Sequence, residues 1–579
     1  MNYPLWSLPS PGLLIAFVAI VHVFISHFAV GGGLFLVLAE RKARREGDAA
    51  FLGYVKRHSR FFILLTLVMG AITGVGIWFT IGLVHPQATS TLINTFVWGW
   101  AIEWTFFVTE IAAAMVYFYG WDRLSPRAHL AVGWVYFAAA WLSLVVINGI
   151  LSFMLTPGEW LATGGFWSGL LNPTYWPSLF ARTFTAVGLA GLYALLTAAR
   201  LEDGALKVKV ARYAGAWIVP MAIALPASIA WFLVAAAGAG VPVGEILGAS
   251  GDGIGALARA LFSGSPSGHP IALNAARVVL LGSAATLTIS LLVVYARPRS
   301  FGRPAVFALL ACAFAAMGAG EWVREDLRKP YVLGRHMLVN GVRLPRPAGA
   351  PQPPADVAAA IGSDRFTLDA LRTAGVLKAS HWVRTPSSSA DPATRLEAEG
   401  SEVFRLACSS CHTIDGYIAI RPLVQGKTTE ALSALITRLA LPVDAQGREA
   451  AWSDPHLRLQ TWRGRRMPPF PGTDAEREAL AFYLARLGGA PSTLPAAPVT
   501  ASPAKAYFDE QCSACHGQGA DFPIGGRGRT AAQLYEMLGR LPQVNEMMPP
   551  FEGPDELRRA LADYLASLPA ARTATGGAR

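Results

Sequence analysis

The hydrophobic residues of the chain gather in eight long apolar runs, all before about residue 325. Each run holds about 20 residues or more, the length that an α-helix needs to cross the hydrocarbon core of a membrane. The runs cover residues 12–39, 60–84, 96–119, 130–155, 179–199, 213–237, 271–295 and 304–323. This pattern predicts eight transmembrane helices.

The first run differs from a secretion signal that would be removed after export. No basic residue precedes it, and it is too long for the apolar part of a signal. It also carries His22, His27 and three consecutive glycines at 31–33. We therefore interpret it as a retained membrane helix.

Beyond about residue 325 the chain changes character. Proline, arginine, alanine and acidic residues become frequent, and no apolar run approaches the ~20 residues of a membrane span. The composition, with 53% hydrophobic and 15% charged residues, is therefore an average over a membrane part and a soluble part. We expect a mainly α fold, with an eight-helix transmembrane bundle followed by small α-helical modules.

Lysine and arginine are concentrated in the connections on one side of the predicted bundle. The connections after helices 1, 3, 5 and 7 hold sixteen of them, whereas the opposite connections hold only Arg259. Basic loops stay in the cytoplasm, so the N-terminus and the soluble part are expected on the periplasmic side of a bacterial inner membrane. The formal net charge of +11 partly reflects these loops. It favours contact with anionic membrane lipid and not with nucleic acid.

The soluble part contains the same arrangement of motifs twice. A Cys-x-x-Cys-His motif is followed each time by a Met-Pro-Pro-Phe sequence, and the two copies begin at Cys408 and Met467 and at Cys512 and Met548. In such a motif the two thiols form thioethers with the heme, and the histidine ligates its iron. The methionine, 55 residues after His412 or 32 after His516, can ligate the other face.

A single Cys-x-x-Cys pair would also suit zinc or a redox dithiol. The repeated histidine and methionine favour two covalently attached heme c groups instead. The residues expected to bind them are Cys408, Cys411, His412 and Met467 in the first copy, and Cys512, Cys515, His516 and Met548 in the second.

These features divide the chain into four parts. A membrane domain at 1–330 is followed by a linker region at 331–395 and by cytochrome c modules at 396–490 and 500–572. The stretch between the modules is rich in Pro, Ala, Ser and Thr, which predicts an extended linker. The linker region at 331–395 is proline-rich at first and then predicts a helix over 366–379.

Several ionisable side chains lie within the predicted membrane helices, where they are costly and usually functional. They are His22, His27, Glu103, Glu110, Arg182, Arg277, Glu321, Arg324 and Glu325. Glu103 and Glu110 are seven residues apart and therefore share one helix face. Spacing alone predicts a heme or ion site of unspecified kind. Glu321 and Arg324 would also suit the membrane interface, and His27 would also suit a plain hydrogen bond.

Three passages of the membrane part resemble subunit I of the cytochrome bd-type oxidases. They are Ala19-Ile20-Val21-His22 above the glycine run; Gly70-Ala71-Ile72-Thr73-Gly74 with Glu103, Glu110 and Gly120-Trp121-Asp122-Arg123-Leu124; and Val323-Arg324-Glu325 with Arg328 and Pro330. The resemblance covers roughly residues 1–335. The Gly-Trp-Asp-Arg-Leu turn is its most specific part.

The resemblance implies that His22 is an axial heme ligand in the oxygen-reactive region and that Glu325 is the carboxylate ligand of a neighbouring high-spin b heme. Glu103 and Glu110 resemble the family's carboxylates near the heme pair and on the proton route, although their separation is one residue shorter than usual. Arg328 joins them as a candidate catalytic residue. Two non-covalent hemes of b or d type and a second membrane subunit are implied as well.

The chain also departs from the family in the places that serve quinol oxidation. The family holds a low-spin heme with a histidine in helix 5 and a methionine in helix 7, where this chain has Arg182 and Val279. Neither side chain can donate a lone pair to iron. The outward loop at 238–270, which corresponds to the family's quinol site, is rich in Gly, Ala and Ser.

These observations favour a bd-like oxidoreductase that is linked to cytochrome c. Electrons would come from a soluble or membrane cytochrome c, or another periplasmic carrier, and would pass through two c hemes to a membrane site that reduces O2 or a similar small oxidant. One alternative is a quinone-linked conduit that delivers electrons outward without oxygen chemistry. Another is a heme-based sensor of small gases.

The repeated motif generates a first prediction. Changing Cys512 and Cys515 together to alanine should remove one of two covalent hemes and leave the membrane part inserted, because each module attaches its own heme. A denaturing gel stained for heme measures this, and a variant chain that still carries two hemes would contradict the assignment.

Overall fold

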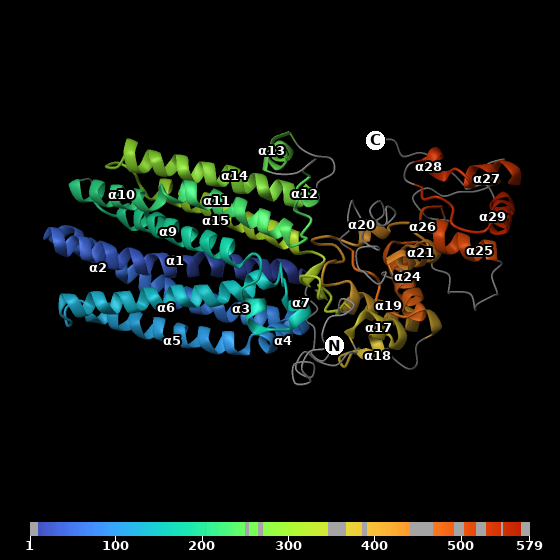
Figure 1. Cartoon of the computed structure of the whole chain (residues 1–579), viewed down its shortest axis with the longest axis horizontal. Helices are drawn as coiled ribbons and strands as arrows, with labels where there is room; N and C mark the ends of the chain where they lie inside the picture. The colour runs from blue at the N-terminus through green and yellow to red at the C-terminus, as the bar shows by residue number, and fades with distance from the viewer. Residues whose placement is uncertain are drawn as a thin grey trace. The chain divides into compact units, whose positions relative to one another are not determined.

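The structure is a computed structural model that describes residues 10–202, 204–248, 254–263, 270–344, 366–384, 391–439, 467–490, 503–516, 529–545 and 548–568. These residues are mainly helical (Figure 1). They belong to two compact units, one built on Leu13–Met337 and the other on Ser363–Arg579. Each unit is described by itself.

The first unit contains the eight predicted spans, each a helix long and apolar enough to cross a membrane. They are α1 (Pro11–Glu46); α2 (Ala49–Ile63), the π-helical η1 (Leu64–Gly70) and α3 (Ala71–Val84); α5 (Val97–Gly120); α6 (Pro126–Phe153); α9 (Tyr175–Ala198); α10 (Ala205–Ile218) with α11 (Met221–Gly238); α14 (Pro270–Leu291) with the π-helical η2 (Leu292–Ala296); and α15 (Arg303–Arg328). The predicted number of membrane helices is therefore confirmed.

Several spans extend beyond the predicted apolar runs at their charged ends. The first continues to Glu46, and the second already begins at Ala49, where the Asp48 side chain accepts a hydrogen bond from the Phe51 amide (2.8 Å). Helical backbone hydrogen bonds do not depend on apolar side chains, so a helix continues through charged residues until a capping residue ends it. Hydropathy locates the membrane crossing but not the end of the helix.

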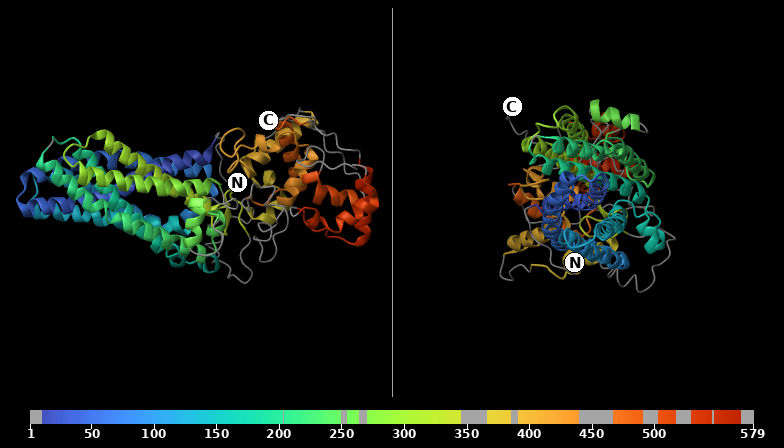
Figure 2. Two further views of the ribbon diagram at one scale, coloured as in Figure 1. Left: turned by 90° about the horizontal axis from the view of Figure 1, so that it is seen from above. Right: turned by 90° about the vertical axis from the view of Figure 1, so that its left-hand side faces the viewer.

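Helix α1 runs through the middle of the bundle (Figure 1 and Figure 2). Its aromatic side chains contact rings on α15, α2 and α10, through the pairs Phe24–Phe314, Phe28–Phe62 and Phe35–Trp217. Its three consecutive glycines face three other elements, because successive residues of a helix point about 100° apart. A Cβ on Gly31 would lie 1.8 Å from the Ala186 carbonyl oxygen of α9, and one on Gly33 would lie 2.3 Å from the Tyr136 ring of α6.

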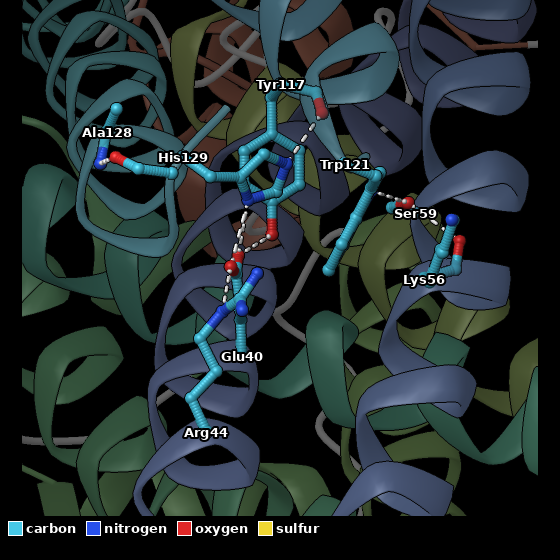
Figure 3. A network of polar contacts seen from close by, with 9 residues as sticks. Glu40, Arg44, Lys56, Ser59, Tyr117, Trp121, Ala128 and His129 are labelled. Carbon is cyan, nitrogen blue, oxygen red and sulfur yellow. Dashed lines mark hydrogen bonds and ion pairs between the residues drawn. The ribbon is translucent and has the colours of Figure 1, made fainter. Parts of the chain in front are cut away.

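The turn between α5 and α6 carries the Gly-Trp-Asp-Arg-Leu sequence. The Trp121 indole donates to the Ser59 hydroxyl (3.0 Å; Figure 3). Lys56 forms an ion pair with Asp122 (2.6 Å), so this turn is fastened to α2 at two points. Ser125 caps the start of α6 by accepting a hydrogen bond from the Ala128 amide. The pairing of α5 with α6 is therefore fixed at the end of the bundle that carries the basic loops, which we call the basic end.

Short elements connect the spans at the opposite end of the bundle. They are α4 (Pro86–Thr95), α7 (Trp160–Thr163), α8 (Phe166–Leu170), α12 (Val243–Ile246), α13 (Ile254–Ser263) and the strands β1 (Tyr331–Leu333) and β2 (Met337–Leu338). The Gly334 amide after β1 donates to the Met154 carbonyl (2.9 Å), and the His336 ring meets the Trp160 ring edge-on. The chain that leaves α15 thus packs on the loop after α6.

The second unit contains both Cys-x-x-Cys-His motifs. The first lies among α19 (Pro392–Ala407), α20 (Arg421–Val424), α21 (Thr429–Leu439) and α24 (Asp474–Leu487), and the second among α25 (Pro503–Tyr507), η4 (Phe508–Cys512), α26 (Ser513–His516), α27 (Ala531–Leu538), α28 (Leu541–Val544) and α29 (Asp555–Ser567). Each motif has its own apolar core, represented by Phe404 and Leu480 in the first case and by Phe508 and Leu561 in the second.

The helix predicted over 366–379 is divided in the structure. It forms α17 (Leu368–Ala374) and α18 (Val376–Ala379), because Gly375 adopts a left-handed φ of 91°. The amides of Val376 and Leu377 donate to the Glu476 carboxylate of α24, at 2.9 and 2.8 Å. This part of the chain, assigned by sequence to the linker region, therefore packs on the first c module.

The glycines of α1 generate a prediction with an internal control. Gly31→Ala should destabilise the folded protein by about 1–3 kcal/mol or more, because its methyl group would push α9 away from α1. Gly12→Ala on the same helix, where a Cβ would meet nothing within 4 Å, should be neutral or slightly stabilising. Denaturation in detergent, followed by circular dichroism, compares the two; equal stabilities would show that the close approach of α1 and α9 is unimportant.

Candidate functional sites

The first Cys-x-x-Cys-His motif follows α19 directly. The Cys411 and His412 amides both donate to the Cys408 carbonyl, at 3.1 and 2.9 Å, so the motif forms a tight turn. The Nδ1 atom of His412 lies 3.2 Å from the Ile418 carbonyl oxygen. A carbonyl only accepts, so Nδ1 carries the hydrogen and Nε2 keeps a lone pair. That Nε2 lies 3.3 Å from the sulfur of Met467.

This donor set suits a c-type heme. Two thiols stand one turn apart, and an imidazole nitrogen and a thioether sulfur face each other from distant parts of the sequence. The His412 side chain is buried, and the half-buried Cys408 and Met467 border the apolar core of the module. The structure therefore brings together the four residues predicted for the first heme.

The second motif is built on short helical elements. Cys512 ends η4, and Cys515 and His516 lie in α26. The loop with Met548 is fastened to the same module, since the rings of Tyr507 and Phe551 lie 5.0 Å apart and the Glu552 amide donates to the Tyr507 hydroxyl (3.2 Å). The second methionine thus lies in the module that carries the second motif.

A buried carboxylate holds the first module to the segment before it. Glu402 of α19 accepts hydrogen bonds from the Arg405 guanidinium (2.7 and 3.0 Å) and from the Arg384 amide (3.0 Å), and its side chain is 7% exposed. Burial alone would raise the pKa of Glu402, but these hydrogen bonds hold that pKa below its usual value. The contact therefore favours the ionised carboxylate.

In the membrane unit, His22 lies against the α3 segment that the resemblance includes. Its Nδ1 is 3.0 Å from the Thr73 hydroxyl, and a Cβ on Gly74 would lie 3.1 Å from the ring. The glycine leaves room for the imidazole, and the threonine fixes the orientation of the ring. With Nδ1 occupied, Nε2 is the nitrogen that would coordinate iron.

Glu325, near the end of α15, forms a close ion pair with Arg328. Arg328 also donates to the Val332 carbonyl (2.8 Å) and so connects this carboxylate to β1. Among the described residues, no hydrogen bond or ion pair joins Glu325 to His22. The structure places the two residues that would hold membrane hemes on different helices of one bundle.

Glu103 and Glu110 occupy one face of α5, as their spacing predicts. Glu103 accepts a hydrogen bond from Ser143 (2.8 Å), and Glu110 contacts the Tyr136 hydroxyl (2.9 Å); both partners lie on α6. Each carboxylate thus has one hydroxyl partner and no cation within ion-pair distance in the described part of the chain. A carboxyl group in such a setting can carry a proton.

The two positions where the family would have low-spin heme ligands both face one turn of α15. Arg182 of α9 forms an ion pair with Glu321 (3.5 Å), which also pairs with Arg324 (2.7 Å). Val279 of α14 faces Gly320, where a Cβ would lie 3.9 Å from the valine methyl group. A charge pair and an apolar contact therefore occupy this region of the bundle.

The structure contains a buried polar cluster at the basic end of the bundle that the sequence did not predict. Glu40 of α1 contacts His129 of α6, Tyr117 of α5 and Arg44 on its own helix (Figure 3). A signal was present in the sequence: Tyr117 continues the seven-residue spacing of Glu103 and Glu110, and His129 stands seven residues before Tyr136. No such spacing in the sequence points to Glu40 of α1.

Two parts of the chain match known protein families. The family model "Cytochrome bd terminal oxidase subunit I" matches residues 13–246, and "Cytochrome C oxidase, cbb3-type, subunit III" matches residues 499–565. The solved structure of the bd oxidase from Geobacillus thermodenitrificans is similar at 16% identity and a TM-score of 0.42, over 61% of this chain and 92% of that chain. A search of curated proteins gave no match.

The eight spans and the two family matches indicate a multi-pass membrane heme protein that contains a cytochrome bd subunit I-like domain. More particularly, the chain is a fusion that joins a cytochrome bd subunit I domain near its N-terminus to a cbb3-type cytochrome c domain near its C-terminus. The two matched families suggest oxidoreductase activity and heme binding in both parts.

The Glu402 contact generates a prediction with a defined pH dependence. Because the folded-state pKa is lowered, the ionised carboxylate stabilises the module above the usual carboxyl pKa of about 4.3, and this contribution disappears as the pH falls through the lowered value. Glu402→Gln should cost about 1–3 kcal/mol at pH 7 and progressively less in acid.

Denaturant unfolding followed by c-heme absorbance measures this difference. Glu397→Gln is the matched control on the same helix, because its ion pair with Arg486 is exposed (3.2 Å, with 38% of the Glu397 side chain accessible). It should change stability by at most about 1 kcal/mol. A Glu402 effect that does not vary with pH would contradict the role of the ionised carboxylate.

Proposed function

We propose that the protein is a cytochrome c-linked oxidoreductase of the bd type. It takes electrons from a periplasmic donor, such as a soluble or membrane cytochrome c, through two c-type hemes, and reduces O2 or a similar small oxidant at a heme site in the membrane. The hemes, when bound, supply the electron transfer and the oxygen chemistry. The residues of this chain bind and orient them and manage protons.

This proposal rests on two contacts that side chains of α9 and α14 make with one turn of α15. Arg182 is occupied by Glu321, and Val279 lies against Gly320, so neither position offers an iron ligand. A quinol-oxidising heme would have to find other ligands there. The same chain carries two Cys-x-x-Cys-His modules, which provide another route for electrons.

The proposed orientation makes that route direct. The sixteen basic residues of the alternate loops favour the cytoplasmic side for the end of the bundle that carries them. The residues after α15 then leave the membrane on the periplasmic side, where cytochrome c donors are found. A second membrane subunit would complete the assembly, as is common in the family, and the remaining apolar surface would face lipid.

The polar groups of the membrane unit suit oxygen chemistry better than a simple electron conduit. His22 and Glu325 would hold the membrane hemes, with Arg328 positioning Glu325. Glu103 and Glu110 can each carry a proton, and reduction of O2 to water consumes protons. A conduit that delivers electrons outward has no need of protonatable groups along α5.

This proposal predicts a donor preference. With reduced cytochrome c as donor, the wild-type protein should consume O2, whereas quinol should be a poor donor. Met467→Ala or Met548→Ala should slow consumption at least about tenfold, because loss of an axial ligand changes the reduction potential of the iron. His22→Ala should abolish consumption while both c hemes remain reducible; His381→Ala, at an exposed histidine, serves as the control.

An oxygen electrode and an optical spectrum of the reduced protein provide the measurements. Carbon monoxide should shift the spectrum of the wild-type membrane hemes, since an open iron site binds it, and the shift should change in His22→Ala, because one membrane heme loses its protein ligand. Rapid O2 consumption with quinol by a chain that lacks both c modules would contradict the c-fed route. No consumption with any donor would favour the quinone-linked conduit instead.

A further inference from the structure

Helix α21 forms one wall of the first c module. Its Leu432 and Ile436 belong to the apolar core of that module. Cys408 and Met467, two of the residues expected to bind the first heme, border the same core. One side of α21 therefore faces the core that surrounds the first heme site.

The opposite side of α21 is buried as well. Successive residues of an α-helix point about 100° apart, so Ala431 and Ala434 point away from the side that carries Leu432 and Ile436. Only 2% of Ala431 and 4% of Ala434 is exposed. Because the core of the first module lies on the other side of the helix, another part of the chain must cover these two alanines.

The covering elements come from the second c module. Helix α21 contacts η4 and α26, which carry the second Cys-x-x-Cys-His motif and belong to the same compact unit (Figure 1). Ser513, which lies between the two cysteines of that motif, is 3% exposed. Alanine and serine have small side chains, so the helices can approach closely. The motif expected to bind the second heme is therefore seated directly on α21.

A charged pair flanks this contact. Glu430 is exposed on α21, and Lys505 lies in α25 of the second module. The hydrogen bond from Lys505 to Asp509 is the main reason that the pKa of Lys505 is raised above its usual value, and the negative charge of Glu430 adds to this effect. Since Glu430 and Lys505 belong to different modules, their attraction favours the docked arrangement.

The connection along the chain would not produce this arrangement by itself. The sequence between the modules predicts an extended linker, because it is rich in Pro, Ala, Ser and Thr. Modules joined only by such a linker would meet in varying orientations, and the distance between their hemes would vary. A buried contact through α21 removes this freedom.

We propose that α21 docks the second c module on the first, so that electrons pass directly between the two c hemes across one helix. The inference rests on the proposed function for the source and the destination of these electrons. The two heme sites lie on opposite sides of α21, whose diameter with its side chains is roughly 10 Å. Each transfer oxidises one heme iron and reduces the other by one electron, without a change of bonds or a proton.

Pulsed electron paramagnetic resonance of the full-length holoprotein tests the docking. Spin labels are attached at Arg395→Cys on α19 and Asp563→Cys on α29, which are exposed positions in different modules, and Cys312→Ala removes the cysteine of the membrane unit. The distances between the labels should form one narrow distribution. Ala434→Glu should broaden it, because its carboxylate would be buried against the second module. A broad distribution without this substitution would overturn the docking.

Ala475→Glu is the matched control, since Ala475 is an exposed alanine of α24 in the same module. It should leave the distribution narrow. Glu430→Lys changes only an exposed side chain, so it does not disturb the fold of α21, and it should broaden the distribution by repelling Lys505. A distribution that stays narrow in both Ala434→Glu and Glu430→Lys would contradict the interface, and so would equal broadening in Ala475→Glu.

Anaerobic reduction kinetics test the electron transfer without turnover of the membrane site. A reduced flavoprotein serves as donor, because its absorbance is distinct from the c-heme bands. In the wild-type protein the two c hemes should be reduced in step, since electrons exchange across α21. In Ala434→Glu one heme should lag at least about tenfold, because transfer then requires an encounter between tethered modules. Ala475→Glu should behave as the wild type.

Oxygen consumption separates this inference from the proposed function. If the wild-type protein consumes no O2, the proposed function fails, whereas a narrow distance distribution and a lagging heme in Ala434→Glu would still support the docking. If the wild-type protein consumes O2 but its c hemes remain in step in Ala434→Glu, the proposed function holds, and direct transfer across α21 is overturned. Equal c-heme content in all variants shows that both modules still fold and attach heme.

Discussion

Close packing around α1 is the constraint on which the membrane unit depends. Three successive glycines allow the α9 backbone, a ring of α2 and the Tyr136 ring of α6 to approach α1 from different directions. In a membrane, helices associate through such close contacts and through interhelical hydrogen bonds, because lipid offers no hydrophobic driving force between them. The position of α6 against α1 follows, and so does the meeting of Glu40 with His129.

The same helix carries two polar sites at different depths. His22 and Glu40 are 18 residues apart, or roughly 27 Å along α1. In the proposed function, electrons reach the His22 region from the periplasm, whereas Glu40 lies at the end of the bundle that carries the basic loops. The seven-residue repeat of α5 and α6 gives three polar contacts, Glu103–Ser143, Glu110–Tyr136 and Tyr117–His129.

Much of this architecture could be predicted from the sequence because it depends on local patterns. Apolar length predicted the eight spans. The spacing of Cys408, Cys411 and His412 predicted one heme-binding motif, and the structure folds it into a tight turn. The partner of each group was harder to predict. Glu40 and His129 are 89 residues apart, and nothing in either helix alone reveals which residues of the other it meets.

The extent of the first c module shows the same limit. The sequence predicts one helix over 366–379 and gives no reason to connect it with Glu476, about 100 residues later. The carboxylate that forms the N-terminal capping box of α24 also accepts the Val376 and Leu377 amides. A surface capping motif and a buried docking site look identical in sequence, because burial depends on what packs over the helix.

Arg182 stands where the family has a heme-ligating histidine, and its contacts show that this replacement involves more than one residue. A single arginine within a membrane bundle is costly unless a counter-charge accompanies it. Here Glu321 supplies that charge and is itself shared with Arg324, so three charged side chains from α9 and α15 stabilise one another. A return to heme ligation at this place would require changes on both helices at once. The bundle is therefore adapted to the absence of that ligand, which agrees with the proposed entry of electrons through the c modules.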